Sequence, residues 1–414
     1  MTLALSTKSI ITSARTSLHE MSAINRFFHV FWLLGPFVLL IERSPADLWL
    51  TILGLAFVVR SIITRDGEWL RVFWVRASFA FWGVCIVTSA LSTNPIFSLT
   101  EAFIWFRFPL LAFATVFWLG KDKRVIYAML LSMAVGLLVM CSILTAEIII
   151  EGQKGGRLVW PYGDPLPGSY IAKFGLPVFV VMVALAVGVT GPLAAVSAIL
   201  ALATLVVSIL TGERINFLIR ACGGMLAGMV WRPIWSRYIS LVIVEVLAVV
   251  IVFQAAPSIG NRYVDNFIEQ LPTQQESPYR KAMDPGFELF QNNPLTGVGV
   301  GSFQRHCNKL ATPDYTPSCH PHPHNYYIQM LAETGVFGLI FGVIFIGAMI
   351  WSCFAHGWRY RANVVTATAW VVPFGLFWPI ASTADFFGQW NNIFLWTALA
   401  VALASVNITD DDRL

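Results

Sequence analysis

The chain has 414 residues, of which 57% are hydrophobic and only 12% are charged, and its formal net charge at pH 7 is +4. Its mean hydropathy is +0.69. These values exclude an ordinary soluble globular domain and indicate a protein embedded in a membrane. A transmembrane β-barrel is excluded as well, because barrel strands are short segments of alternating polarity, whereas this chain has long continuous apolar runs.

The apolar runs are each long enough to cross the hydrocarbon core, which takes about 20 helical residues. We therefore expect an all-α integral membrane protein with about 12 transmembrane helices. The expected spans are 24–42, 47–64, 73–93, 97–119, 125–149, 169–189, 191–211, 214–231, 235–255, 333–353, 363–382 and 388–407. We expect no cleavable signal peptide, because the apolar run that follows the polar residues 1–23 is too long for a signal-peptide core.

Lysine and arginine gather in the short loops on one side of the predicted bundle, and this asymmetry orients the chain. The cations on this side are Lys8, Arg15, Arg26, Arg60, Arg65, Arg71, Arg76, Lys121, Lys123, Arg124, Arg232, Arg237, Arg359 and Arg361. The loops between spans 3 and 4 and between spans 11 and 12 lie on the other side and carry neither residue type. Both termini are therefore predicted to be cytoplasmic. In a bacterium this is a multi-pass protein of the inner membrane whose opposite side faces the periplasm.

Residues 256–332 form the only long polar segment between predicted spans. We expect three parts in the chain: helices 1 to 9 in residues 1–255, a periplasmic loop domain in residues 256–332, and helices 10 to 12 in residues 333–414. So long an insertion is more often functional than idle. The stretch "PGFELFQN" predicts a short helix there, and "PLTGVGVG" a tight glycine-rich turn.

Two of the six cysteines, Cys307 and Cys319, fall in this periplasmic segment. An oxidising compartment permits a disulfide between them, the alternative being two free thiols. The other four cysteines lie in or near spans and are expected to act as small apolar residues. A zinc site built from nearby histidines is the less favoured alternative, because no paired-cysteine ligand spacing accompanies them. These histidines are His306, His320, His322 and His324.

Cations also collect on the predicted periplasmic side, where acids are few. They are Arg157, Arg214, Arg262, Arg280, Lys281, Arg305 and Lys309. Guanidinium groups bind phosphate oxygens two at a time, so this set suits an anionic headgroup such as a lipid pyrophosphate. Arg107, Lys173 and Arg220 lie within predicted spans, where a charge marks a site or a structural pairing, and the sequence leaves both interpretations open.

Four motifs in this order resemble those of the O-antigen ligase family. His324 and Asn325, nine further residues, then Gly335 and Gly338 fit the family's His-Asn-x9-Gly-x-x-Gly pattern. "NPLTGVGVGSF" at 293–303 is similar to its glycine-rich turn. Arg214 with Leu218 resembles its Arg-x-x-x-Leu element, and Arg280 in "SPYRKAM" resembles the arginine that heads its outer loop.

The resemblance implies a GT-C-like integral-membrane glycosyltransferase of lipopolysaccharide biosynthesis. Such an enzyme transfers a glycan from undecaprenyl diphosphate to a sugar hydroxyl of the lipid A core, without nucleotide, metal or other cofactor. We expect catalytic roles for His324, Arg214 and Arg280. We expect Arg157, Asn325, His322 and Lys281 to bind the diphosphate or the glycan. No nucleic-acid partner is expected, and a monomer is compatible with the sequence.

The chemistry of the transfer suits these residue types. Displacing a lipid diphosphate at an anomeric carbon requires stabilisation of charge on the leaving group, which arginines supply. It also requires a base for a weakly acidic hydroxyl, and an imidazole that is neutral near pH 7 can accept that proton. We expect His324 either to act as this base or to orient the acceptor, in a single inverting step. Asn325 is expected either to cap the following helix or to hold the imidazole tautomer.

Two alternatives remain at this stage. The first is another enzyme of the same superfamily, an O-antigen polymerase or an O-linked protein oligosaccharyltransferase. A polymerase is expected to have two large periplasmic loops, whereas this chain has one. The second is a transporter of lipid-linked glycans, which would require internal repeats and charges near the bilayer midplane. The sequence has no clear repeat, and its charges gather on one side.

Overall fold

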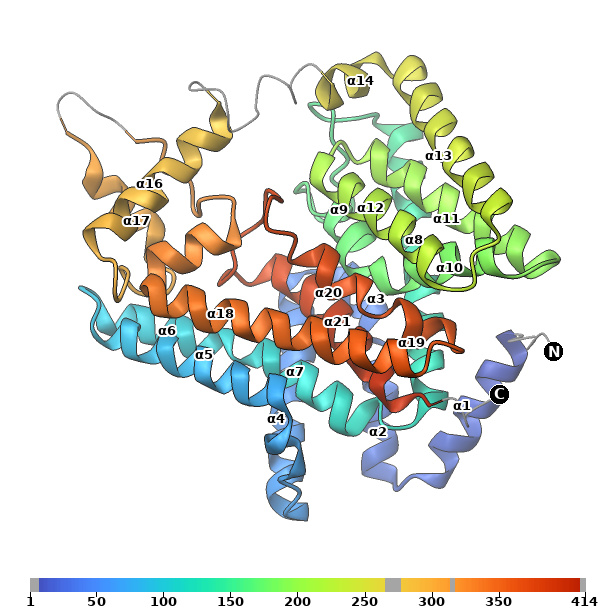
Figure 1. Cartoon of the computed structure of the whole chain (residues 1–414), viewed down its shortest axis with the longest axis horizontal. Coiled ribbons are helices and arrows are strands. Elements are labelled where there is room, and N and C mark those ends of the chain that lie inside the picture. The colour runs from blue at the N-terminus through green and yellow to red at the C-terminus, as the bar shows by residue number, and fades with distance from the viewer. Residues whose placement is uncertain (1–6, 265–276, 313–316, 410–414) are drawn as a thin grey trace.

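The computed structural model describes residues 7–264, 277–312 and 317–409, and every regular element in these ranges is a helix (Figure 1). The β-type pairing in the described part is one isolated bridge between Lys154 and Arg157. Seven of the described helices are long and apolar enough to cross a membrane, or nine if each of two bent helix pairs is one span. The expected class, an all-helical multi-pass membrane protein, is therefore confirmed.

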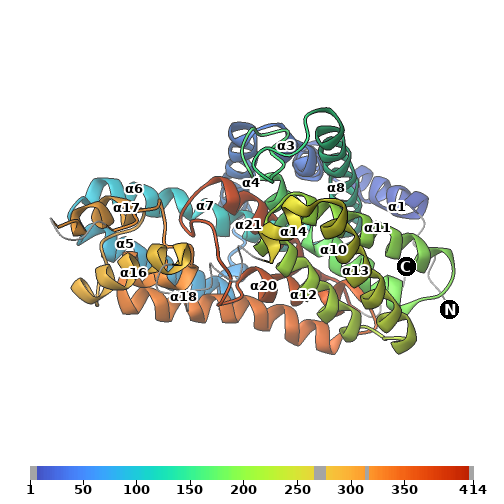
Figure 2. The same cartoon turned by 90° about the horizontal axis from the view of Figure 1, so that it is seen from above.

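The seven long helical segments agree with predicted spans. They are α4 (Arg43–Thr64), α5 (Phe73–Ala90), the run Pro95–Leu119, α8 (Lys123–Ile150), α11 (Pro192–Leu210), α13 (Trp235–Ala255) and α18 (Tyr326–Arg359). The run Pro95–Leu119 consists of α6 (Pro95–Trp105), α7 (Arg107–Ala114) and a π-helical turn at Thr115–Leu119. Helices α5 and α18 lie side by side in both views (Figures 1 and 2).

Two predicted spans are bent pairs. The pair α2 (Ala23–Leu33) and α3 (Gly35–Ile41) bends by 51°, and the pair Pro167–Phe174 and α10 (Leu176–Gly188) bends by 55°. Proline stands in the first turn of both α3 and α10, where it cannot continue the preceding helix because it lacks an N–H and clashes with the turn before it. The two bends are joined by a hydrogen bond of 2.8 Å from the Tyr170 hydroxyl to the Pro36 carbonyl.

The three remaining predicted spans correspond to shorter helices, so the count of twelve stays a prediction. These helices are α12 (Arg214–Val230), the pair α19 (Val364–Thr368) and α20 (Val371–Leu376), and α21 (Trp390–Ala404). Every residue of α21 from Asn392 to Ala404 is buried. A sequence that is apolar on all sides fits either lipid or a protein interior. In α21 the apolar residues face other helices.

Helix α18 begins earlier than the predicted span and breaks at Gly335, whose φ is 67°. The glycine-rich turn at 294–301 lies against this break. The amide of Val336 donates to the Pro294 carbonyl at 2.9 Å, and the amide of Gly299 donates to the Glu333 carbonyl at 2.9 Å. A Cβ atom at Gly335 would overlap the carbonyl of Leu295. Two of the sequence motifs thus form one structural unit.

The described part of the long polar segment contains the α-helices α14 (Pro257–Tyr263), α16 (Pro278–Asn292) and α17 (Phe303–Cys307), a 3-10 helix at Asn308–Leu310 and the first residues of α18. The predicted short helix at "PGFELFQN" is the second half of α16. Helices α16 and α17 lie beside the start of α18 at one end of the molecule, whereas α14 continues from α13 (Figures 1 and 2). The parts of the segment at 265–276 and 313–316 fall outside the described residues.

Candidate functional site

A pocket of ≈310 Å³ opens between α12, α14, α16 and the segment that precedes α18, and we call it the arginine pocket. Its lining residues are Arg157, Arg214, Arg262, Pro278, Tyr279, His320 and His324. Each of its three arginines comes from a different part of the chain. Several guanidinium groups that meet in one cavity form a suitable binding site for a polyanion.

Arg214 is the first residue of α12, so the positive end of that helix dipole adds to its own charge. Its Nη2 lies 3.4 Å from the Tyr279 hydroxyl, and its guanidinium carbon lies 6.0 Å from the centroid of the Tyr279 ring. Tyr279 therefore holds the guanidinium at the rim of the pocket. The helix start and the aromatic ring together fix the direction in which the charge points.

The turn before α12 positions the other two arginines. Arg262 donates from Nε to the Gly212 carbonyl at 2.8 Å. Gly212 has a φ of 73°, and a Cβ atom there would overlap the backbone carbonyl of Gly156. Arg157 is the residue directly after Gly156, and its backbone exchanges hydrogen bonds of 2.9 and 3.1 Å with the backbone of Lys154. The turn thus draws α14 and the loop after α8 toward the first residue of α12.

The charges in this region are crowded. Burial and the neighbouring charges of Arg157 and Arg214 lower the pKa of Arg262. Burial raises the pKa of Glu213, the residue before Arg214, to about 7, although nearby cations oppose the shift. At neutral pH this carboxyl carries only part of a negative charge. The pocket therefore keeps a positive potential that an anionic ligand would relieve.

His324 lies opposite the arginines in a left-handed backbone conformation, with a φ of 55°. Its carbonyl accepts a hydrogen bond of 2.8 Å from the Thr383 amide. Its ring centroid lies 4.5 Å from that of His322, 5.3 Å from that of His320 and 6.4 Å from that of Tyr279. Burial, with the neighbouring histidines, lowers the pKa of His324 to about 4. The ring is therefore neutral near pH 7 and able to accept a proton.

His322 lies behind His324 and does not line the pocket. Its Nε2 lies 3.2 Å from the Thr383 carbonyl, which assigns the proton of the neutral ring to that nitrogen. Burial lowers the pKa of His322 to about 4, and the charge of Lys173 adds to the effect. The Lys173 ammonium itself donates to the Asn391 side chain at 3.3 Å. His322 thus supports the ring of His324 from the protein side.

Asn325 is the N-cap of α18. Its side-chain oxygen accepts from the amides of Tyr327 and Ile328 at 3.0 and 3.2 Å, and its Nδ2 donates to the Pro379 carbonyl at 2.8 Å. The capping alternative for this residue is confirmed. Both polar ends of the amide are occupied by the protein, so Asn325 fixes the chain next to His324.

The segment 377–387 supports this whole arrangement, and no sequence motif indicated its role. In addition to the contacts of Thr383 and Pro379, the Phe377 carbonyl of this segment accepts a hydrogen bond of 2.6 Å from the Tyr327 hydroxyl. The Asp385 carboxylate accepts from Gln329 Nε2 at 2.6 Å. These partners are mostly backbone atoms. Every residue type has them, so the sequence alone cannot show which of them will lie near the site.

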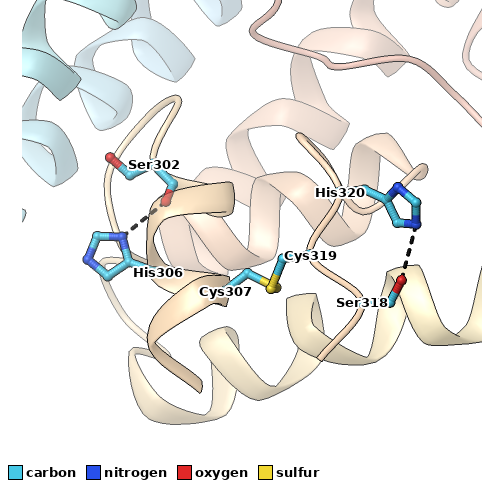
Figure 3. The surroundings of a disulfide bond; sticks show 6 residues. All are labelled: Ser302, His306, Cys307, Ser318, Cys319 and His320. Atoms are coloured by element: carbon cyan, nitrogen blue, oxygen red, sulfur yellow. Dashed lines mark hydrogen bonds between the residues drawn. A yellow bond between two sulfur atoms is a disulfide. The ribbon is translucent and has the colours of Figure 1, made fainter. Parts of the chain in front are cut away.

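The disulfide predicted between Cys307 and Cys319 is confirmed, with the two Cα atoms 5.6 Å apart (Figure 3). It joins α17 to the segment that carries His320, whose Nε2 lies 3.2 Å from the Ser318 hydroxyl. His306 lies in α17, where its Nδ1 is 3.0 Å from the Ser302 carbonyl. Within the described ranges, no three His, Cys, Asp or Glu side chains converge as metal ligands.

Not every predicted site residue lies at the pocket. Arg157, Arg214 and His324 line it, and His322 and Asn325 lie behind it. Arg280 lies on α16, with its Nε 3.6 Å from the Asp284 carboxylate and its side chain 43% exposed. Lys281 is exposed on the same helix. Neither residue lines the arginine pocket.

Four lining residues were not among the predicted site residues: Arg262, Pro278, Tyr279 and His320. Arg262 belonged to the set of outer cations, but no motif distinguished it. Tyr279 directly precedes Arg280 in "SPYRKAM", and His320 belongs to the histidine cluster. For Arg262 the available signal was its charge, and for Tyr279 and His320 it was their nearness to a recognised motif.

Two of the arginines within predicted spans, Arg107 and Arg220, form hydrogen bonds with the protein. Arg107 donates to Asp47 at 2.9 Å. Arg220 donates to the Ile171 carbonyl at 2.8 Å and to the Thr204 hydroxyl at 2.5 Å, and its guanidinium carbon lies 3.8 Å from the centroid of the Phe179 ring. The structural interpretation therefore accounts for both arginines.

Fold and site together define a multi-pass helical membrane protein with a cationic pocket and a neutral histidine at its wall. Residues 198–343 match a protein-family model described as O-antigen ligase. The matched region includes Arg214, Arg262, Tyr279, His320 and His324 but neither Arg157 nor the segment 377–387. This match supports the resemblance found in the sequence: residues 198–343, about a third of the chain, are similar to the O-antigen ligase family. A comparison with curated proteins found no match.

Proposed function

We propose that this protein is an O-antigen ligase of the bacterial inner membrane. It transfers a glycan from undecaprenyl diphosphate to a sugar hydroxyl of the lipid A core, on the periplasmic side, and requires neither a metal nor a nucleotide. The observation that carries this proposal is the meeting of three arginines and a neutral histidine in one pocket, within a region similar to the O-antigen ligase family.

The arginines bind the leaving group. Arg157, Arg214 and Arg262 approach from three segments and present guanidinium donors to the two phosphates. As the bond between the anomeric carbon and the phosphate oxygen breaks, negative charge grows on the diphosphate, and fixed cations stabilise it in the transition state. No acid is needed for this leaving group, because it departs as an anion.

His324 acts on the acceptor. The acceptor hydroxyl oxygen attacks the anomeric carbon from the face opposite the diphosphate, and its proton passes to a ring nitrogen of His324. The carbon–oxygen bond to the core sugar forms as the bond to the phosphate breaks, so the anomeric configuration inverts. Undecaprenyl diphosphate leaves, and His324 returns the proton to water.

Arg280 retains a role by resemblance. It lies next to Tyr279 and forms an exposed ion pair with Asp284, which contributes little to stability. A rotation of this side chain toward the pocket would bring a fourth guanidinium to the donor. Lys281 is the corresponding candidate contact to the glycan.

The test is transfer by the purified protein in lipid nanodiscs. One reaction contains undecaprenyl-diphosphate glycan and lipid A core, and the other contains donor alone. Glycan on the core, lost in His324→Ala but kept in the control His306→Ala, supports the proposal. His306 is hydrogen-bonded to the Thr93 hydroxyl and does not line the pocket. Lengthened lipid-linked glycan in the second reaction would make the protein a polymerase. Transfer to the core that is unchanged in His324→Ala would remove the proposed base.

A further inference from the structure

A second pocket lies away from the arginine pocket, and we call it the Arg60 pocket. It has a volume of ≈290 Å³ and is lined by Met21, Asn25, His29, Arg60, Trp118, Lys121 and Asp122. Helices α1 (Thr7–Glu20) and α2, which frame it, lie in the lower right of Figure 1, whereas α14 and α16 lie near its top. The Lys and Arg distribution predicts this end to be cytoplasmic.

Two of the lining side chains have buried donors without an acceptor. Trp118 is 6% exposed, and its Nε1 has no hydrogen-bond partner among the described residues. The same holds for Nη1 of Arg60, whose nearest described carboxylate oxygen, on Asp66, is 3.8 Å away and thus beyond hydrogen-bonding distance. The Arg60 guanidinium carbon lies 5.7 Å from the centroid of the Trp118 ring. Both unmatched groups are donors, so a ligand that supplies acceptor atoms would satisfy them.

The net charge at the pocket is positive. Lys121 is exposed and forms no ion pair within residues 7–264, 277–312 and 317–409. Asp122 is the one acid in the lining, and its carboxylate is already taken by Arg124 Nη2 at 2.8 Å and by the Ser17 hydroxyl at 2.6 Å. Lys121 therefore remains to attract an anion, together with Arg60, whose ion pair with Asp66 is long at 3.8 Å.

We propose that the Arg60 pocket binds a phosphate group, and that its source is the headgroup of an anionic glycerophospholipid. A phosphodiester carries only acceptor oxygens, which match the unpaired donors of Trp118 and Arg60. Apolar side chains of α2 and α4 are exposed beside the lining residues, among them Ile24, Phe27 and Ile62. Acyl chains attached to the phosphate would cover such a surface, which favours a lipid over free phosphate. This inference does not depend on the proposed transfer activity.

The test measures thermal stability of the full-length protein in detergent while a ligand is added. A ligand that binds only the folded state raises the melting temperature. Phosphatidylglycerol is expected to raise it, and phosphatidylcholine is not. In R60Q/K121Q the apparent affinity for phosphatidylglycerol is expected to fall about tenfold or more, since two charge-assisted contacts are lost. The control K8Q/R71Q removes two exposed cations that do not line the pocket and is expected to behave as wild type.

Trp118→Phe keeps an aromatic ring at this position while it removes the Nε1 donor, together with the second ring of the indole. It is expected to weaken phosphatidylglycerol binding several-fold. Equal affinity for phosphatidylglycerol in wild type, R60Q/K121Q and Trp118→Phe would overturn the proposal. If R60Q/K121Q does not fold, Trp118→Phe and Arg60→Lys replace it, and affinities equal to that of wild type in both would overturn the proposal as well. Inorganic phosphate that raises the melting temperature as much as the lipid, with the effect lost in R60Q/K121Q, would keep the phosphate site and overturn the lipid as its source.

Discussion

His324 occupies a backbone conformation that few residues other than glycine adopt, with a φ of 55°. Such a conformation persists only where the surroundings hold it, and it is frequent at functional sites. Here the Thr383 amide donates to the His324 carbonyl, and the next residue, Asn325, is held in place because its side chain caps α18. The ring therefore projects into the arginine pocket from a defined point of the chain.

The neutral state of His324 gives a prediction for the pH dependence of transfer. A base with a pKa of about 4 loses activity only when the pH falls toward that value, so the rate is expected to stay constant from about pH 5.5 to 7.5. His322→Asn removes one of the neighbours that lower this pKa. The acid limb of the pH–rate profile is then expected to move upward, toward the usual histidine pKa of about 6.5. A wild-type acid limb already near 6.5, or one that His322→Asn leaves in place, would contradict this account.

The arginines give a second prediction. Arg157→Gln, Arg214→Gln and Arg262→Gln are each expected to lower kcat/KM about 10- to 100-fold, the range for loss of one charge-assisted contact. Initial rates at low donor concentration measure this effect. Lys309→Gln is the matched control, because Lys309 is an exposed outer cation away from the pocket. An Arg262→Gln variant with the kcat/KM of Lys309→Gln would remove Arg262 from the site.

At the scale of elements, the break in α18 connects two motifs that are about 30 residues apart in the sequence. The Glu333 carboxylate accepts from the amides of Gly301 and Phe303 at 2.9 and 3.0 Å, and so ties α17 to α18. Together with the disulfide, this contact fixes the framework on which His320 and His324 lie. The glycines of both motifs thus have a structural role, and we assign the proposed glycan transfer to residues near them.

Gly335→Ala tests this framework. The substitution places a side chain at a positive φ, where it overlaps the Leu295 carbonyl, so the free energy of unfolding is expected to fall by more than about 1 kcal/mol. Gly347→Ala in the same helix is the control, since a Cβ atom there meets nothing within 4 Å. Thermal unfolding compares the two variants. Equal melting temperatures would show that the close approach of turn and helix is absent.

The sequence predicted helices well, because their apolar runs depend only on local composition. It could not tell which of them face lipid. Helix α21 was predicted as a span for its uniform apolarity, yet it is a short helix buried among others. The bends at Pro36 and Pro177 were likewise missed, since the runs around them remain apolar.

At the scale of the whole molecule, the arginine pocket is assembled from segments that span residues 157 to 324. Placing cations on one side of the membrane brought Arg157 and Arg214 into one set of candidates, and the family motif added His324. It did not separate Arg262, which lines the pocket, from Arg280, which does not. That distinction depends on how α14 and α16 pack, and charge patterning contains no information about packing.

The predicted orientation can be tested with single cysteines. Asn94→Cys lies in a loop predicted to be periplasmic, and Ala362→Cys lies in one predicted to be cytoplasmic; both positions are exposed. A membrane-impermeant maleimide added to spheroplasts is expected to label Asn94→Cys only. In inverted vesicles it is expected to label Ala362→Cys only, with the parent protein as control. The reverse pattern would place the arginine pocket on the cytoplasmic side and contradict the proposed function.

The central claim is that the arginine pocket holds the diphosphate of the donor beside His324. The most direct measurement is an experimental structure of the protein with undecaprenyl diphosphate bound. We predict phosphate oxygens within about 3 Å of the guanidinium groups of Arg157, Arg214 and Arg262, the usual length of a charge-assisted hydrogen bond. The ring of His324 is predicted to face the open side of the diphosphate. A diphosphate bound at Arg280 and Lys281, with the arginine pocket empty, would contradict the account.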